Sequence, residues 1–441
     1  MLKRIFENFF KPMPASRAGK LKKGEKTMAL NLNPTLKNKV QPSATFAVSN
    51  AADALIKQGK DVIGFGAGAP DEPFAGSVFQ HGVQLLSDIN NAVMISKYPP
   101  IAGMPKLINA VVEKHQQQAG VTLTPENVLI TNGGKQALFN FMLSVVNPGV
   151  RDEVILLAPA FVSYLPQVHI AGGKEIIIQG KMENGWKISP EEIEAYITDK
   201  TAAIIICSPN NPTGHMYGYD ELQAITDVLS KHPDVWVFSD EVYDDLVFDP
   251  HYFTPMLAFK ELLGDRLVVS NGISKGYAMT GLRGGWIITT NSELMKSLKK
   301  LQSHSTSGIC TLTQLLGAHA LGLKDSEWTE AYCAGYAEKS RILTEALLKI
   351  DGVKLHQPEG SLYVYPSFQE WSGKHYDDGG PITTCQGLAM HLLEHGLVAA
   401  VPGGAFFSPP EEMCLRLSAC PAESKLIEGA ERIGNFLANL K

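Results

Sequence analysis

Lys275 is the residue whose surroundings point most directly to covalent chemistry. It lies in the string Ser274-Lys275-Gly276-Tyr277-Ala278-Met279-Thr280-Gly281-Leu282-Arg283, which follows the apolar run 267–269. A lysine amine that leaves a buried strand and enters a pocket loses water and becomes nucleophilic toward an aldehyde. A lone lysine after a strand is more often a solvated surface charge, but apolar neighbours and a nearby arginine are a poor setting for one. The string therefore predicts that Lys275 forms a Schiff base.

Asp240 and Tyr243 form a second polar group, which follows the apolar run 235–238. A buried carboxylate needs a positive partner, because burying an unpaired charge is very costly. A protonated pyridine nitrogen is such a partner: at about 4 Å and an effective dielectric of about 20 the attraction is roughly 4 kcal/mol, or about 3 pKa units. Tyr243 can then donate a hydrogen bond to a phenolate oxygen of the same ring. The alternative is a structural Asp240 paired with an arginine of the core.

Two turns complete the candidate site, and each directly follows an apolar run. The turn Ser208-Pro209-Asn210-Asn211-Pro212-Thr213-Gly214 holds the Asn211 amide rigidly beside the end of a strand. The segment Thr131-Asn132-Gly133-Gly134-Lys135-Gln136 joins a strand to a helix, where backbone N–H groups and the helix dipole favour a phosphate. Arg283 can add a bidentate contact to that phosphate. The spacing differs from that of a nucleotide-binding P-loop, and a phosphate monoester fits better.

Buried strands that alternate with amphipathic helices must position these residues. Near-continuous apolar runs are expected for a mostly parallel sheet with helices on both faces. Ligands of such sheets bind beyond the carboxyl ends of the strands. The predicted fold class is therefore α/β, with strands near 128–130, 154–157, 175–178, 203–206, 235–238, 267–269 and 286–288 and helices near 136–145, 221–230 and 293–303.

The pattern changes after about residue 320. A long helical segment at 328–349 is followed by strand-like pieces at 361–364 and 415–418, which indicates a smaller α+β domain. Two domains also agree with the length of 441 residues, which exceeds what one simple core organises.

The composition favours small-molecule chemistry in a reducing compartment. A formal net charge of -6 gives no attraction to nucleic acid or to anionic membranes, and no apolar run is long enough to cross a bilayer. Six cysteines are scattered without a CxxC pair, and we found no histidine cluster at metal-ligand spacing, so no metal site is predicted. A cytoplasmic location follows as the expectation.

Residues 1–27 stand apart as a basic tail, with eight Lys or Arg against Glu7 and Glu25. A basic leader poor in acidic residues is compatible with a mitochondrial-type presequence. Lysine outnumbers arginine, however, and Met28 offers an independent start, which favours a loose extension of a bacterial protein.

The strings quoted above resemble the class I aminotransferases that bind pyridoxal 5′-phosphate (PLP) in fold type I, in particular the bacterial and archaeal aspartate aminotransferase branch. The similarity runs from about residue 36 to the C-terminus, and its most specific pieces are the strings around Lys275, Asn211, Asp240 and Gly134. The resemblance implies a large PLP-binding domain at 76–320 with a mostly parallel seven-stranded sheet. It also implies a small domain at 321–441, to which an N-terminal segment at 28–75 contributes.

The resemblance also implies roles for individual residues. Arg416 matches the arginine that clamps the substrate α-carboxylate, Gly68 matches a glycine that meets the substrate, and Phe161 lies where the family stacks an aromatic ring on the pyridine. A homodimer is implied, in which each active site receives Tyr98 from the partner subunit, and Ser305 and Thr306 are candidates to cross similarly. The predicted cofactor contacts are Tyr98, Gly134, Lys135, Phe161, Asn211, Asp240, Tyr243, Ser274, Lys275 and Arg283, and the predicted substrate contacts are Gly68, Phe161, Asn211 and Arg416.

The predicted activity is amino transfer from an L-amino acid to a 2-oxo acid such as 2-oxoglutarate, with Lys275 as the proton shuttle. Aspartate is the expected donor, although two residues depart from the aspartate pattern. Gln41 stands before Pro42-Ser43 where this branch often has a lysine, and Phe161 stands where many aspartate enzymes have tryptophan. Two alternatives for the reaction stay open: a donor with an aromatic or other neutral side chain, and a PLP-dependent carbon–sulfur lyase of the same fold. Two further alternatives are the effector domain of a transcription regulator, which would need an attached DNA-binding domain, and a purely structural role in which Lys275, Asp240 and Arg283 are unrelated members of ion pairs.

Overall fold

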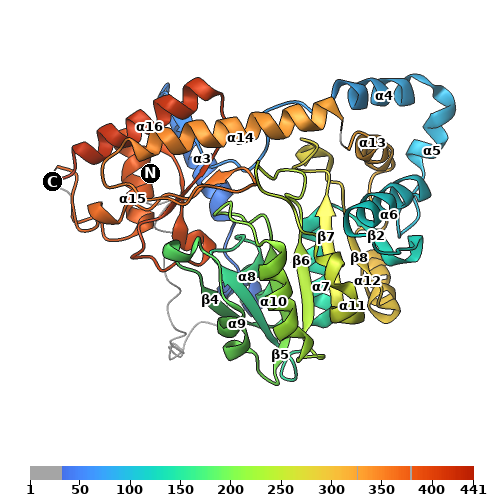
Figure 1. Ribbon diagram of the computed structural model, residues 1–441. Coiled ribbons are helices and arrows are strands. Elements are labelled where there is room, and N and C mark those ends of the chain that lie inside the picture. Colours follow the sequence, from blue (N-terminus) through green and yellow to red (C-terminus); the bar gives the residue numbers. More distant parts are fainter. Residues whose placement is uncertain (1–31, 325, 378–379) are drawn as a thin grey trace, which may run out of the picture.

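The computed structural model of the protein describes residues 32–324, 326–377 and 380–441 (Figure 1). The basic tail predicted at 1–27 lies outside these ranges. Within the described ranges, no helix combines the length and the apolar character that crossing a membrane requires.

A seven-stranded sheet forms the centre of the larger part of the molecule, in the order β2-β8-β7-β6-β5-β3-β4. Only β8 runs antiparallel to its neighbours, so the sheet is mostly parallel, as predicted. Each of the seven predicted apolar runs forms one of its strands, and β5 is buried along its whole length. The strands are β2 Val128–Thr131, β3 Glu153–Ala158, β4 Lys174–Gln179, β5 Thr201–Cys207, β6 Trp236–Asp240, β7 Leu267–Gly272 and β8 Gly285–Thr289.

Helices pack on both faces of this sheet, because alternate strand residues point into two separate apolar clusters. Ile204 and Val269 belong to one cluster, whereas Ile205 and Val268 belong to the other. The three helices predicted in this region are present as α7, α10 and α12. The helices of this part are α4 Gly76–Ser87, α5 Ala92–Ser96, α6 Pro105–Ala119, α7 Gly134–Val145, α8 Tyr164–Ile170, α9 Pro190–Tyr196, α10 Tyr219–Ser230, α11 Lys260–Leu263, α12 Ser292–Ser305 and α13 Thr311–Leu321.

The C-terminal residues pack with the N-terminal segment around a third apolar cluster, which includes Val48, Phe65, Leu347 and Leu417. Two small sheets lie here. One of them joins the N-terminal segment to the C-terminal residues, because β1 pairs with β10 in parallel. This agrees with the predicted contribution of 28–75, while the domain bounds stay a prediction. The elements are α2 Pro34–Asn38, α3 Ala44–Ile56, β1 Ile63–Gly64, α14 Glu327–Leu348, β9 Tyr363–Val364, α15 Cys385–His391, β10 Val398–Ala399, β11 Val401–Pro402, β12 Leu415–Ser418 and α16 Glu423–Ala438.

Helix α14 links the two parts, and Figure 1 shows it as the long orange helix that runs across the molecule. Ser326 caps its first turn, and the helix continues for 22 residues. Tyr332, near its start, donates a hydrogen bond to the backbone carbonyl of Lys275 at 2.8 Å. Leu347, near its end, is buried in the cluster formed by the C-terminal residues.

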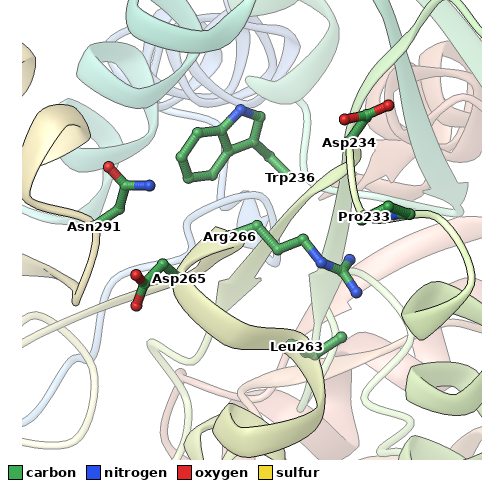
Figure 2. A pocket seen from close by; sticks show the side chains of 7 residues that line it. All are labelled: Pro233, Asp234, Trp236, Leu263, Asp265, Arg266 and Asn291. Atoms are coloured by element: carbon green, nitrogen blue, oxygen red, sulfur yellow. The ribbon is translucent and has the colours of Figure 1, made fainter.

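A pocket of about 480 Å³ opens at the amino ends of β6 and β7 (Figure 2). Arg266 lines it, but its guanidinium already donates to the carbonyls of Leu229 and Val235, at 2.9 and 3.2 Å. None of the predicted site residues lines this pocket, and it lies at the sheet edge opposite to them. We therefore place the candidate active site elsewhere.

Candidate active site

Lys275 lies three residues beyond the end of β7, at the carboxyl edge of the sheet. Its side chain is half-buried, and Nζ donates a hydrogen bond to the backbone carbonyl of Gly68. The backbone of the loop is fixed by Tyr332, by Ala278 and Arg283 in the left-handed region, and by the buried neighbour Ser274. The amine is therefore held where the N-terminal segment meets the sheet.

Asp240 ends β6, and its carboxylate Oδ2 accepts a hydrogen bond from the Tyr164 hydroxyl at 2.8 Å. Burial raises the pKa of Asp240 to about 6, although the bonds from Tyr164 and from the Val242 backbone lower it. Within the described ranges, no Lys, Arg or His forms an ion pair with Asp240, so the alternative of a structural pair with a core arginine is wrong. The site thus offers a buried carboxyl group to a cationic ligand.

An anion cradle lies where β2 meets α7, formed by Gly133, Gly134, Lys135, Ser270 and Arg283. Gly133 adopts φ +74°, and a Cβ there would lie 2.8 Å from the Arg283 guanidinium. A Cβ on Gly134 would lie 3.2 Å from the Ser270 hydroxyl, which is buried and has no hydrogen-bond partner in the described chain. Burial and the positive charges of Arg283 and Lys275 lower the pKa of Lys135. Glycines, N–H groups at a helix start and concentrated positive charge suit a phosphate dianion.

Arg416 on β12 is almost fully buried, yet it has no carboxylate partner among the described residues. Its Nη1 donates to Asn211 Oδ1 at 3.2 Å, and its Nη2 donates to the Gly66 carbonyl at 2.7 Å. The guanidinium lies over the rings of Tyr363 and Phe406, at 4.3 and 5.0 Å from the ring centres. A buried guanidinium without a counter-ion is suited to receive a carboxylate from a ligand.

Asn211, Tyr243, Phe161 and Gly68 were also predicted as site residues, and each lies beside one of the groups described above. Asn211 Nδ2 donates to the Tyr243 hydroxyl at 3.4 Å, and the Tyr243 and Tyr363 hydroxyls are 3.1 Å apart. The ring of Phe161 lies 5.3 Å from Lys135 Nζ and packs edge-on against Tyr164. A Cβ at Gly68 would collide with the Tyr363 hydroxyl, so a larger residue there would displace Tyr363.

Three predicted residues lie at the periphery of one chain. Tyr98 is 91 % exposed and makes no contact with the groups above. Ser305 and Thr306, at the end of α12, are also exposed, although Thr306 accepts a hydrogen bond from Gln136 at 2.6 Å. A single chain therefore does not bring these three side chains to Lys275.

Sequence reasoning missed four contributors: Tyr164, Tyr332, Tyr363 and Phe406. Tyr164 lies three residues after Phe161 in a string that was read only for its stacking ring, and its position at the start of α8 was the available signal. The other three come from the C-terminal part, where no string marks a contact to Lys275 or to Arg416.

The fold and these groups together define an α/β enzyme with a reactive lysine, a buried carboxyl group and an anion cradle. The family described as aminotransferase class I and II matches residues 60–433, so the chain belongs to the class I and II aminotransferases. An aspartate/prephenate aminotransferase of Cereibacter sphaeroides is 38% identical over 404 residues, which cover 91% of this chain and 98% of that protein. A probable aspartate/prephenate aminotransferase of Rhizobium leguminosarum is 36% identical, with 92% and 98% covered.

Solved structures show the same fold. The aspartate aminotransferase of Rhizobium meliloti has a TM-score of 0.87 at 30% identity and covers 94% of this chain and 100% of its own. The Thermus thermophilus enzyme with maleate has a TM-score of 0.82 at 32% identity, with 92% and 99% covered. The predictions of the family, of PLP fold type I and of a PLP-dependent aminotransferase are thereby confirmed. The lyase and regulator alternatives are not supported.

The residues present fit PLP. Its pyridine nitrogen needs an acidic partner, which the buried Asp240 carboxyl supplies. Its phosphate needs donors, which the Ser270 hydroxyl, the Arg283 guanidinium and the start of α7 supply. The Ser270 hydroxyl has no partner in the described chain, whereas Arg283 donates to the carbonyls of Thr280 and Asn132, at 2.9 and 3.3 Å. Its aldehyde needs an amine, which Lys275 supplies.

Glu241 follows Asp240 and offers a prediction on pH dependence. Burial raises its pKa from 4.5 to about 8, while Oε1 accepts hydrogen bonds from the Ser239 hydroxyl and the Met256 N–H, both at 2.9 Å. Between these two pKa values the folded chain holds a proton that the unfolded chain releases. Stability should therefore fall as the pH rises through this window, by up to about 1.4 kcal/mol per pH unit.

Glu241→Gln keeps the shape and the acceptor oxygen but removes this proton. We expect a flatter pH dependence of the free energy of unfolding, measured by urea titration at pH 5.5, 6.5 and 7.5. The exposed Glu261→Gln variant serves as the control and should keep the wild-type slope. Equal slopes for wild type and Glu241→Gln would show that Glu241 is ionised in the folded chain.

Proposed function

We propose that this aminotransferase takes its amino group from aspartate and passes it to a 2-oxo acid such as 2-oxoglutarate. The observation that carries the proposal is the buried Arg416 guanidinium, which has no counter-ion among the described residues and lies beside Asn211 and Gly66. The similar proteins named above support aspartate as donor, since their names include it. The Thermus thermophilus enzyme adds a second support, because its structure was solved with maleate, a dicarboxylate.

We propose the following division of work in the site. When bound, PLP supplies an aldehyde that condenses with amines and a ring that withdraws electrons from the substrate α-carbon. Arg416 and Asn211 hold the substrate carboxylate, and Asp240 keeps a proton on the ring nitrogen. The Lys275 amine takes the proton from the α-carbon and returns it to the C4′ carbon of the cofactor. The remaining cofactor contacts are Gly134, Lys135, Phe161, Tyr243, Ser274 and Arg283.

A second candidate acceptor is prephenate, itself a 2-oxo acid, because the names of the Cereibacter and Rhizobium leguminosarum relatives include it. Gln41 and Phe161 do not favour this candidate, because prephenate, like aspartate, carries a second carboxylate. Both departures remove donors for such a group, which costs roughly 1.5–3 kcal/mol where the bond involves a charged group.

The test mixes purified holoenzyme with single amino acids and follows the visible spectrum as the cofactor is converted to its aminated form. We expect rapid conversion with aspartate and glutamate and slow conversion with leucine and phenylalanine. The aminated enzyme is then mixed with 2-oxoglutarate or prephenate, and the return of the aldehyde spectrum measures each acceptor. Faster conversion with phenylalanine than with aspartate would overturn the proposed donor.

We also propose a homodimer in which Tyr98 of each chain reaches the phosphate at its partner's site, with Ser305 and Thr306 near the same boundary. Support comes from the exposure of Tyr98 and from exposed apolar side chains on α4, α5 and the turn between them, at the edge of the molecule far from α15 and α16 (Figure 1). A second copy would bury these side chains, which are Phe79, Val83, Leu86, Ile89, Val93 and Met94.

We also propose a division into two domains and a cytoplasmic location. The division into a large domain at 76–320 and a small domain built from 28–75 and 321–441 is supported by the separate apolar clusters. A cytoplasmic location is supported by the six cysteines, which are all free thiols.

A further inference from the structure

A group of potential metal ligands lies outside the proposed active site, at the last residue of α15 and on the turn that follows it. One ligand atom from each of His391, Glu394 and His395 lies within 4.8 Å of the other two. The sequence analysis predicted no metal site, whereas the structure brings these three potential ligands together. Residues three and four positions apart lie on one face of a helix, so the string His391-Leu392-Leu393-Glu394-His395 was the available signal. The backbone here continues from α15 into a π-helical turn at Leu392–Gly396.

Aromatic stacking holds the outermost of these ligands in place. The ring of Tyr376 lies 4.1 Å from the His395 ring with an angle of 17° between the planes, and Phe436 supports Tyr376 at 5.8 Å and 15°. The His391 and His395 rings are themselves nearly parallel, at 18° and 5.7 Å. Tyr376 is in turn anchored by its bridge to Leu440. Stacking therefore restricts the plane of the His395 ring before any ligand arrives, which lowers the cost of binding.

We propose that His391, Glu394 and His395 bind one Zn²⁺ ion or a similar divalent transition metal ion. Two imidazoles and a carboxylate are ligands that Zn²⁺ accepts, whereas Mg²⁺ and Ca²⁺ prefer oxygen alone. Tetrahedral Zn²⁺ with bonds of about 2.0–2.2 Å holds neighbouring ligand atoms about 3.4 Å apart. Side-chain rotations bring the three ligand atoms to that spacing, and water takes the fourth position.

This ion has a structural effect and takes no part in amino transfer. The three ligands come from one turn, which connects α15 to β10, and the stacked Tyr376 links them to the end of the chain. Binding to the folded chain raises its stability by an amount that grows with the logarithm of the free metal concentration once that exceeds the dissociation constant. The proposal therefore predicts metal-dependent stability together with metal-independent turnover.

The test titrates Zn²⁺ into untagged, chelator-treated holoenzyme and follows binding by calorimetry. We expect one ion per chain at this site, at least about tenfold weaker binding in His395→Ala and in Glu394→Gln, and no binding here in the His391→Ala/His395→Ala double variant. His356→Ala removes an exposed imidazole elsewhere and should bind as the wild type does. Unchanged binding in the double variant would overturn the proposal.

A second readout separates metal binding from misfolding. Without Zn²⁺, Glu394→Gln should unfold at the wild-type temperature and transaminate at the wild-type rate, but the increase in unfolding temperature that Zn²⁺ causes in the wild type should be lost. Co²⁺ should give the visible absorption bands of a tetrahedral site in the wild type and not in the double variant. Equal Zn²⁺-dependent stabilisation of wild type and variants would contradict the assignment.

Discussion

Lys275→Ala is expected to lower kcat/KM for amino transfer by about 10³–10⁴-fold. General acid–base catalysis alone contributes about 10²–10⁴, and the same side chain also anchors the cofactor through its amine. Lys135 is not expected to replace it, because its ammonium belongs to the anion cradle and lies over the Phe161 ring at 5.3 Å. The measurement is steady-state turnover of aspartate with 2-oxoglutarate at saturating cofactor.

Three comparisons make this result specific to Lys275. Lys174→Ala removes an exposed ammonium that pairs with Asp152 at 3.4 Å, and it should leave turnover unchanged. Lys275→Arg keeps a positive charge but offers no transferable proton near neutral pH, so it should be nearly as inactive as the alanine variant. Addition of a small primary amine should restore part of the lost rate. Wild-type turnover by Lys275→Ala would refute the assignment of the lysine.

Lys114→Met is expected to lower the free energy of unfolding by about 3–5 kcal/mol. Lys114 on α6 is fully buried and forms ion pairs with Asp244 at 3.0 Å and with Asp245 at 2.6 Å. Burial opposes its charge, but the two carboxylates outweigh burial and hold the pKa of Lys114 well above its usual range. Methionine fills a similar volume but leaves both carboxylates buried without a cation.

Urea unfolding at fixed protein concentration measures this loss. Lys231→Met breaks an exposed pair with Glu194 and should change stability by less than about 1 kcal/mol. The triple variant Lys114→Met/Asp244→Asn/Asp245→Asn removes the stranded charges and should recover much of the loss. A midpoint for Lys114→Met equal to that of the wild type would contradict this account.

The same ion pairs lie directly behind the catalytic loop. A Cβ on Gly276, the residue after Lys275, would lie 2.6 Å from Asp245 Oδ2. Lys114 Nζ also lies 5.5 Å from the centre of the Tyr277 ring. Partial unfolding of this region should therefore reduce turnover as well as stability.

The sheet and the polar groups at its carboxyl edge were predictable because each rests on a local pattern. Every strand of the large sheet is a short apolar run, and Asp240, Asn211 and Lys275 each follow one within a few residues. Parallel strand direction then brings these ends together. Local sequence was sufficient here because the information lies within single strand–loop units.

The contacts made by the C-terminal part were not predictable in the same way. The hydrogen bond from Tyr332 to Lys275 joins residues 57 positions apart, and that from Arg416 to Gly66 joins residues 350 apart. Such contacts depend on how the two parts pack, which no single string encodes. Strands β10 and β11, with two residues each, are also too short to show the alternation that identifies a strand, whereas β9 and β12 lie within the pieces predicted at 361–364 and 415–418.

Helix α14 couples the position of the Lys275 backbone to the position of the C-terminal part of the chain. This helix of 22 residues is about 33 Å long. Near its start, Tyr332 donates a hydrogen bond to the Lys275 carbonyl, and near its end, Leu347 is buried in the apolar cluster of the C-terminal part. A continuous helix moves largely as a rigid body, so a rotation at one end of α14 also displaces the other end. A displacement of the C-terminal part would thus be transmitted through Tyr332 to the backbone of the lysine that moves the proton.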